Sequence, residues 1–239
     1  MNNTKPLVVF VITSALTESL VTGLELFYQQ HGRIFNARIF STHDIDEETV
    51  SMDSLAQNLE SADMVFLDIR GGGKAGGVCS RILPGTRQPV ALLLGGTPEI
   101  MSLLRLGSFS MKTILEKTAK KNKDSSPARG PDMRSIQRMM NLVEKGGRVL
   151  PFGKLRHAGN WARLMRYWHQ GGEENIKNML TLSAMEYLGF DLPKPPPPRI
   201  YPDFGIFDPL SGQSYSGLAE YRSAEIGRAS CRERVCHRV

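Results

Sequence analysis

Apolar and polar residues follow two different periods along the first half of the chain. Four short runs are almost entirely apolar and rich in branched side chains, which is typical of strands buried on both faces. These runs occupy residues 7–12, 37–40, 64–67 and 89–94. Between them, apolar residues recur every three or four positions, as in Leu20, Leu24 and Phe27, which is the spacing of an amphipathic helix.

The alternation of strand and helix predicts the fold class. Successive strands joined by helices form a parallel sheet through right-handed crossovers, with helices on both faces. We therefore expect an α/β domain with a Rossmann- or flavodoxin-like parallel sheet over residues 1–117. Thr97 and Pro98 are suited to an N-cap and a first helical position, so we expect a further helix from Pro98 to Leu106.

The second half of the chain has a different composition. Residues 118–131 are rich in Lys, Asn, Ser, Pro and Gly, and we expect them to form an exposed linker. Apolar residues at helical spacing then predict a mainly helical segment over residues 132–192. A run of prolines predicts a stiff polyproline spacer at 193–198, and residues 199–224 are expected to begin a further, truncated domain.

The last residues, 225–239, differ from the rest. A codon series that encodes residues 225–236 resembles a common short-read sequencing adapter, so we interpret this stretch as an artefact. The alternative is a metal site made by Cys231, Cys236 and His237, but a structural zinc site normally has four ligands at recognisable spacing. Without this stretch, which holds four Arg and two Glu, the formal charge falls from +6 to +4.

The remaining composition argues against several classes of protein. The residual positive charge is modest and scattered, which argues against nucleic-acid binding. Cys79 is the only cysteine left, so we expect no disulfide framework and a reducing, cytoplasmic compartment. The longest apolar run, at residues 7–12, is far shorter than the roughly 18 residues of a membrane span.

A glycine-rich stretch, Gly71–Gly77, follows the third predicted strand, where a phosphate-binding loop would lie. The P-loop motif requires Gly five residues before its Gly-Lys pair and Ser or Thr after it, whereas this chain has Asp68 and Ala75 there. We therefore expect a flexible loop at the carboxyl edge of the sheet, an edge where ligands often bind in such folds. A small nucleotide-dependent enzyme that uses Lys74 is an alternative.

Other candidate residues have structural explanations. His43, Asp44 and Asp68 lie near predicted strand ends, and no second constellation points to catalysis there, so we expect loop capping and solubility. Cys79 is expected to pack as a small apolar residue. Gly171–Gly172 and the acidic residues that follow predict a rigid corner between two helices, because glycine adopts positive φ and acidic residues stabilise a helix start.

Four stretches, in order, carry a resemblance to a known family. They are residues 101–111, 148–154, 161–179 and 201–209. Together they resemble the amino-terminal part of the large (H or CobN-type) subunit of the cobaltochelatase and magnesium chelatase family. The family-motif residues, interpreted as structural, are Arg105, Gly107, Phe109, Trp168, Gly172, Glu174, Asn175, Asn178, Tyr201, Pro202 and Gly205. The chain departs from the family at Asp208, where His is common.

The resemblance implies ATP-dependent insertion of Co²⁺ or Mg²⁺ into a corrinoid precursor or protoporphyrin IX, in cobalamin or chlorophyll biosynthesis. It implies that the large subunit binds the tetrapyrrole while separate ring-forming ATPase subunits use ATP and Mg²⁺. Because the family's large subunits are several times longer, we expect an amino-terminal fragment without the reaction centre. No catalytic, cofactor-binding or metal-binding residue is assigned, and a stand-alone Rossmann-like binding module is the alternative.

Aromatic and basic residues share one predicted helix. They are His157, Trp161, Arg163, Arg166, Trp168 and His169. A tetrapyrrole needs apolar ring contacts and cations for its carboxylates, which these residues could supply. The simpler interpretation, which we favour, is an amphipathic helix that buries its tryptophans and exposes its arginines.

Overall fold

The computed structural model describes residues 4–13, 17–121, 153–201, 205–208 and 213–224. The chain divides into two compact units, Met1–Pro198 and Arg199–Val239. Residues 122–152 and 225–239, which include most of the predicted linker, the first part of the predicted helical segment and the adapter-like tail, lie outside the described residues.

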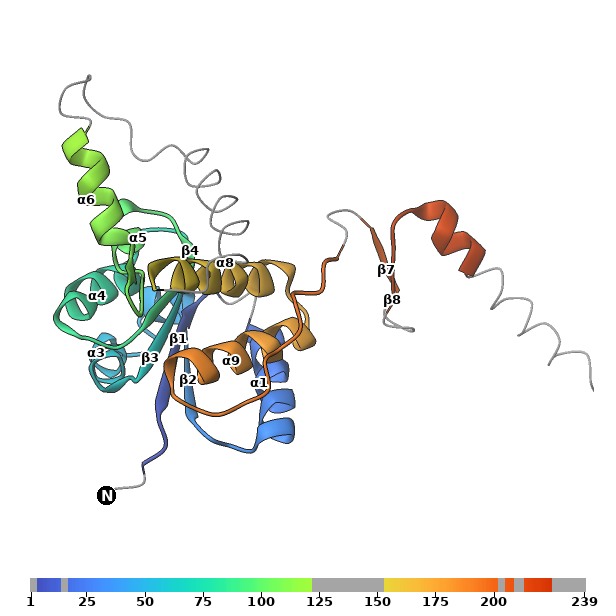
Figure 1. The fold of residues 1–239 in the computed structure, drawn as a ribbon, viewed down its shortest axis with the longest axis horizontal. Coiled ribbons are helices and arrows are strands. Elements are labelled where there is room, and N and C mark those ends of the chain that lie inside the picture. The colour runs from blue at the N-terminus through green and yellow to red at the C-terminus, as the bar shows by residue number, and fades with distance from the viewer. Residues whose placement is uncertain (1–3, 14–16, 122–152, 202–204, 209–212, 225–239) are drawn as a thin grey trace, which may run out of the picture. The chain divides into compact units, whose positions relative to one another are not determined.

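A six-stranded sheet forms the centre of the first unit (Figure 1). Its strands are β1 (Leu7–Ile12), β2 (Asn36–Ser41), β3 (Met64–Ile69), β4 (Val90–Gly95), β5 (Arg105–Leu106) and β6 (Phe109–Ser110). They are arranged in the order β2-β1-β3-β4-β5-β6. The first four are parallel, as predicted, and the short β5 and β6 add an antiparallel edge. The predicted α/β fold class is therefore confirmed, with a mixed rather than a purely parallel sheet.

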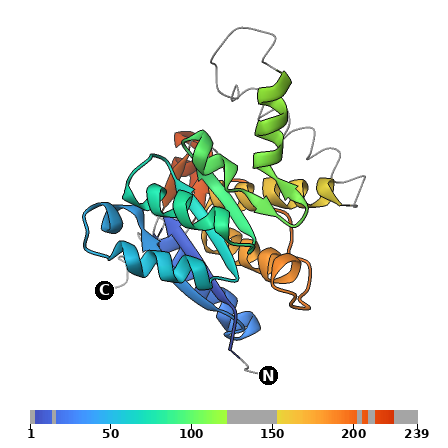
Figure 2. The same ribbon diagram turned by 90° about the vertical axis from the view of Figure 1, so that its left-hand side faces the viewer.

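Helices cover both faces of this sheet (Figures 1 and 2). Those described are α1 (Thr17–His31), α2 (Thr42–Asp46), α3 (Met52–Ser61), α4 (Lys74–Ile82), α5 (Pro98–Ser102), α6 (Met111–Lys121), α8 (Lys154–Gln170) and α9 (Glu173–Tyr187). A 3-10 turn, η2, spans Leu83–Gly85. Helices α1, α8 and α9 pack together on one face, and α3 and α4 pack together on the other. The helical segment and the α/β residues thus belong to the same compact unit.

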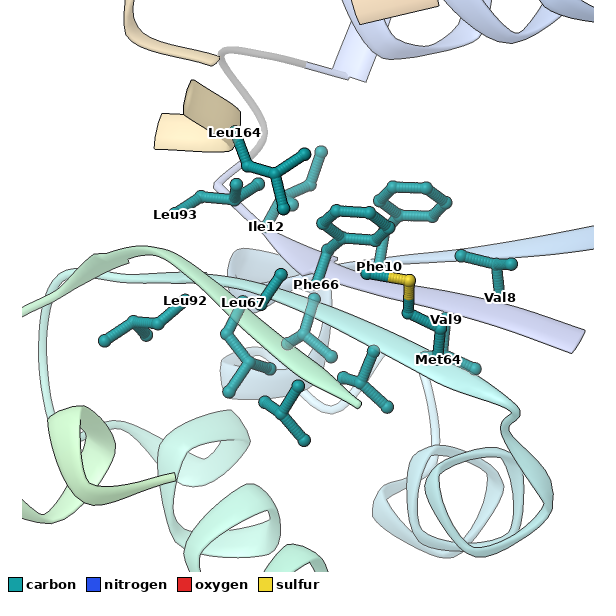
Figure 3. Packing of buried hydrophobic residues seen from close by; sticks show 14 of the residues in the cluster. Val8, Val9, Phe10, Ile12, Met64, Phe66, Leu67, Leu92, Leu93 and Leu164 are labelled. Atoms are coloured by element: carbon teal, nitrogen blue, oxygen red, sulfur yellow. The ribbon is translucent and has the colours of Figure 1, made fainter. Parts of the chain in front are cut away.

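Buried hydrophobic residues of β1, β3, β4 and α8 pack together in one core, part of which is drawn in Figure 3. The rings of Phe10 and Phe66, which are partners in the strand register, stack with their centroids 4.8 Å apart. Leu164 of α8 points from above toward the sheet residues Ile12 and Leu93. Burial of side chains on both faces explains why these strands are apolar without interruption.

Close packing of α1 against α9 depends on one glycine. Gly23 is buried in α1, and a Cβ atom placed on it would lie 2.4 Å from Cγ2 of Ile176 in α9. Only a residue without a side chain lets the two helix backbones approach this closely. Helix α9, which follows the corner at Gly171–Gly172, is thereby held against α1.

One predicted helix is shorter than expected. We predicted a helix from Pro98 to Leu106, but α5 ends at Ser102. The prediction was wrong because Arg105 and Leu106 leave the helix and pair with β4 and β6. Thr97 does act as the N-cap, accepting a hydrogen bond from the N–H of Ile100.

The second unit contains a short hairpin. Strand β7 (Ile206–Asp208) pairs in antiparallel fashion with β8 (Gln213–Tyr215). Residues 218–224 are helical, and the carboxylate of Glu220 accepts hydrogen bonds from the backbone N–H and the hydroxyl of Ser216 at 2.8 and 2.6 Å.

Candidate functional site

The carboxyl edge of β1 and β3 is the position where this type of sheet usually binds ligands. The chain passes from β1 to β2 on one side and then crosses to β3 on the other. Adjacent strands whose connections leave in opposite directions open a crevice at their carboxyl ends. Thr13, just after β1, and Asp68, near the end of β3, are at this edge.

Asp68 is buried rather than exposed in a loop. Its side chain is 1 % exposed, and its Oδ2 accepts a hydrogen bond of 2.9 Å from Nε1 of Trp168 in α8. Oδ1 lies 3.7 Å from Nε of Arg70, whose own side chain is mostly exposed. The predicted role in loop capping and solubility was wrong, because β3 continues to Ile69 and α8 covers its end.

Helix α8 satisfies the polar groups of β4 through its side chains. Nε1 of Trp161 donates a hydrogen bond of 2.7 Å to the carbonyl of Leu92. Nε2 of His169 lies 3.2 Å from the carbonyl of Leu93, to which it donates in the tautomer protonated at that nitrogen. Leu93 is the residue that the register shift between β3 and β4 leaves without a partner on β3. Side chains of α8 therefore complete the strand's hydrogen bonding.

Three buried oxygen atoms near this edge lack a hydrogen-bond partner. They are Oγ1 of Thr13, Oγ of Ser41 and Oδ1 of Asp68, at the ends of β1, β2 and β3. Buried polar atoms of this kind commonly hold ordered water or the polar groups of a ligand. They are the polar atoms through which this edge would contact a small molecule.

The glycine-rich stretch is a loop only in part: Gly71–Gly73 precede the helix and are exposed, whereas the residues from Lys74 to Gly77 form the first turn of α4. Helix α4 begins at Lys74, and its first N–H groups point at the carboxylate of Asp46. The N–H of Lys74 donates to Oδ1 of Asp46 at 2.7 Å, and that of Ala75 to the same atom at 3.4 Å. Because a helix N-terminus attracts anions, Asp46 fills the place that a phosphate would take in a P-loop.

Lys74 is engaged in the same contact. Its Nζ donates to the carbonyl of Asp46 at 2.8 Å and to Oε1 of Glu48 at 2.7 Å. The hydrogen bond from Lys74 lowers the pKa of Glu48. Glu48 has a positive φ of 59°, which is uncommon for a residue with a side chain. We call this contact between α2 and α4 the Asp46 clasp; sequence reasoning missed it, because nothing in the local pattern links Asp46 to Lys74.

The motif residues of the β5–β6 hairpin hold the fold together. Arg105 donates to the carbonyls of Gln88 and Leu83 and to the hydroxyl of Thr86, at 2.7, 2.8 and 2.7 Å. Burial lowers the pKa of its guanidinium. Phe109, the third motif residue here, packs its ring 5.6 Å from that of Trp161.

Gly107 makes room for a histidine. It has a φ of 53°, and a Cβ atom on it would lie 2.3 Å from Nε2 of His157. The His157 ring also lies 5.8 Å from that of Tyr187 in α9. Nδ1 of His157 is buried without a hydrogen bond, beside the buried side-chain polar atoms of Asn160, Glu186 and Tyr187.

Charged side chains near His157 shift its pKa. Nη2 of Arg156 lies 3.4 Å from Oε2 of Glu186. Burial, followed by the charge of Arg156, lowers the pKa of His157, while Glu186 raises it. Burial raises the pKa of Tyr187. The pair His157 and Tyr187 was not anticipated, since α8 and α9 meet only in the tertiary structure.

The corner between α8 and α9 has the expected geometry. Gly171 and Gly172 have φ of 63° and 75°, and the N–H of Gly171 closes α8 on the carbonyls of Tyr167 and Trp168. Glu174 pairs with Lys177 at 2.6 Å in the first turn of α9. The motif residues Asn175 and Asn178 are buried.

The basic and aromatic residues of α8 do not form one site. Trp161 and Trp168 are only 4 % and 3 % exposed, so neither offers a face to a tetrapyrrole ring. His157 packs beside Gly107, whereas His169 is at the carbonyl of Leu93. The tryptophans agree with the simpler interpretation of α8 as an amphipathic helix, whereas Arg163 is half-buried and hydrogen-bonded to the carbonyls of Pro195 and Pro196.

The remaining predicted residues are dispersed. Tyr201 and Gly205 belong to the second unit, Pro202 lies outside the described residues, and Asp208 is buried in β7. His43 and Asp44 lie in α2. Cys79 is buried, as expected, and burial raises the pKa of its thiol to about 12.

The described residues contain neither a candidate metal-binding group nor a candidate membrane span. In the parts of the chain with described side chains, no three His, Cys, Asp or Glu residues are grouped closely enough to hold a metal ion. The helices of these same parts include none that is both long and apolar enough to cross a membrane.

Two curated proteins are similar to part of this chain. The magnesium-chelatase subunits ChlH, chloroplastic, of Oryza sativa subsp. indica and subsp. japonica are each 28% identical to this chain over 145 residues, covering 56% of it and 10% of their own length. The chain thus spans about a tenth of the length of the curated relatives it matches. The resemblance to chelatase large subunits is confirmed by this similarity.

One solved structure and one family model also match this chain. The catalytic subunit of cobaltochelatase from Mycobacterium tuberculosis aligns with 85% of this chain and 12% of its own, at 15% identity and a TM-score of 0.43. Residues 7–162, more than half of the chain, match the family described as "Domain of unknown function (DUF3479)". This chain belongs to the DUF3479 family.

Proposed function

We propose that this chain is the amino-terminal head of the tetrapyrrole-binding large subunit of an ATP-dependent metal chelatase. That enzyme would insert Co²⁺ or Mg²⁺ into a corrinoid precursor or protoporphyrin IX. The natural polypeptide would continue well beyond the present sequence and carry the reaction centre there. A cytoplasmic setting is part of the proposal and rests on the cysteine pattern.

The observation that carries the proposal is the similarity to ChlH, a magnesium-chelatase subunit by name, over 145 residues at 28% identity. Two of the motif residues named from the sequence make contacts within the fold. Arg105 ties β5 to the loop before β4, and Gly107 accommodates His157. A domain whose motif residues maintain its own fold is suited to serve as a scaffold.

The geometry of the usual ligand positions supports the same role. The helix N-terminus at Lys74 is filled by the carboxylate of Asp46. At the end of β3, the carboxylate of Asp68 already accepts a hydrogen bond from Trp168. A domain that fills these positions with its own side chains is consistent with ATP use by separate subunits.

A reconstitution assay tests the proposal. The full chain is mixed with purified ring-forming chelatase ATPase subunits, ATP with Mg²⁺, a porphyrin or corrinoid substrate and the metal to be inserted. We expect no metallated product by absorbance, and no binding of ATP to the chain alone in equilibrium dialysis. Metal insertion by this chain, or ATP binding that is lost in Lys74→Ala, would contradict the proposal.

The second candidate function is a stand-alone Rossmann-like ligand-binding module. The hydroxyl oxygens of Thr13 and Ser41, buried without a hydrogen bond near the carboxyl edge of the sheet, are the observation in its favour. Native mass spectrometry of the purified chain distinguishes the two. A small molecule that is retained by the wild type and lost in Ser41→Ala would favour the module.

A further inference from the structure

The polyproline segment is bound to α8 over part of its length. Nη2 of Arg163 donates to the carbonyls of Pro195 and Pro196, at 2.6 and 2.8 Å. The hydroxyl of Tyr167 donates to the carbonyl of Pro196 as well. Pro195 is buried. Stiffness alone, the property predicted for residues 193–198, does not account for these contacts.

The chemistry of the contact matches polyproline recognition. Proline residues lack an N–H group, so the carbonyls of a polyproline run have no donors within the run and depend on an outside partner. Arg163 and Tyr167 are four residues apart on α8, so both project from the same face of the helix. The Arg163 guanidinium also lies 5.6 Å from the Tyr167 ring centroid. A cation and an aromatic hydroxyl thus form a paired donor surface.

The anchored stretch has definite limits. Before the prolines, Phe190 and Leu192 are partly buried and pack against the core. Within the prolines, Pro195 is buried whereas Pro196 and Pro197 are exposed, and the second unit begins at Arg199. The last of these hydrogen bonds, to the carbonyl of Pro196, is therefore three residues before the second unit begins at Arg199.

We propose that the Arg163–Tyr167 face of α8 is a built-in receptor for the extended polyproline segment. Its occupant is Pro195–Pro196 of the same chain. The segment acts as a strap that fixes the point at which the chain leaves the first unit. Loss of the strap contact releases residues near 190–196 while the sheet and its helices stay folded.

Limited proteolysis with endoproteinase Asp-N measures this release in the full chain. The enzyme cleaves before aspartate, so cleavage at Asp191 reports opening of the strap. Cleavage at Asp68, buried in β3, reports opening of the whole sheet. When opening and closing are fast, the cleavage rate follows the population of the open form.

Two variants remove the donors separately. We expect Arg163→Ala to raise cleavage at Asp191 about tenfold or more, because two hydrogen bonds from a charged group are lost. Tyr167→Phe removes only the hydroxyl and should raise it about three- to tenfold. Cleavage at Asp68 should stay at the wild-type rate in Tyr167→Phe. Arg81→Ala, on the exposed surface of α4, is the matched control and should cleave like the wild type.

The proposal is overturned if cleavage at Asp191 is unchanged in both variants. If Arg163→Ala accelerates cleavage at Asp68 and Asp191 equally, Arg163 stabilises the whole unit and its substitution does not report on the strap. The result for Tyr167→Phe then decides whether the strap exists. A rise confined to Asp191 in Tyr167→Phe supports the strap, and its absence overturns it.

Discussion

Nε1 of Trp168 donates a hydrogen bond of 2.9 Å to the buried carboxylate of Asp68, one hundred residues earlier in the chain. The contact joins the carboxyl end of β3 to the last turns of α8. It places a motif residue of the helical segment on the sheet of the α/β segment. The two segments are therefore parts of one folded unit.

Trp168→Phe should destabilise the first unit by about 2–4 kcal/mol, because it leaves the Asp68 carboxylate without its donor and removes buried ring volume. Asp68→Asn keeps the shape and an acceptor for Trp168, and it should cost less than about 1 kcal/mol. Urea unfolding followed by circular dichroism measures both. Equal losses in the two variants, or none in Trp168→Phe, would show that the contact does not join the segments energetically.

Gly23→Ala should destabilise the protein by about 1–3 kcal/mol. Its new methyl group would overlap Ile176, and overpacking outweighs the gain in helix propensity. Gly77→Ala, an exposed glycine within α4 with open space at its Cβ position, is the matched control. It should stabilise the protein by up to about 1 kcal/mol. Thermal unfolding of both variants checks the pair, and a stabilising Gly23→Ala would contradict the close helix contact.

Removal of the Asp46 clasp should lower the free energy of unfolding by a small amount. Asp46→Ala leaves the first N–H groups of α4 without their acceptor, which costs about 1 kcal/mol, as for the loss of a helix cap. Glu47→Ala, an exposed neighbour, should stay within about 0.5 kcal/mol of the wild type. Denaturant titration compares the two. If both variants had the same stability, Asp46 would not be the acceptor that α4 depends on.

Acid should weaken the cluster around His157. Its pKa in the folded protein is lowered by burial and by Arg156, whereas the unfolded chain takes up the proton near the ordinary value of 6.5. The unfolded state thus binds more protons in the window below about 6.5, and stability falls there as the pH falls. His157→Gln should flatten the loss of unfolding free energy between about pH 7 and pH 5. An unchanged slope would mean that His157 is not protonated on unfolding.

Local pattern was sufficient to predict the parallel strands and most of the long helices. Strands buried on both faces must be apolar, and helices with one buried face must be periodic, so β1, β3, α1 and α9 have clear signatures. The short β5 and β6 have no such signature, because two residues are too few to show a period. They form because β5 pairs with β4, and a short stretch of sequence around β5 and β6 gives no sign of this pairing.

The candidate site could be predicted only in part. Failure of the P-loop motif was visible in the sequence at Asp68 and Ala75. That Asp46 fills the helix N-terminus was not, because the contact depends on how α2 and α4 meet. Likewise the burial of Asp68 follows from Trp168, and polar residues near strand ends are exposed far more often than they are covered.

The most direct test of the central claim is the DNA sequence of the gene in an independent clone, read beyond codon 224. We predict that residues 225–239 are absent and that the reading frame continues for many hundreds of codons with similarity to chelatase large subunits. A stop codon soon after codon 224, or the present tail confirmed in the clone, would contradict the account.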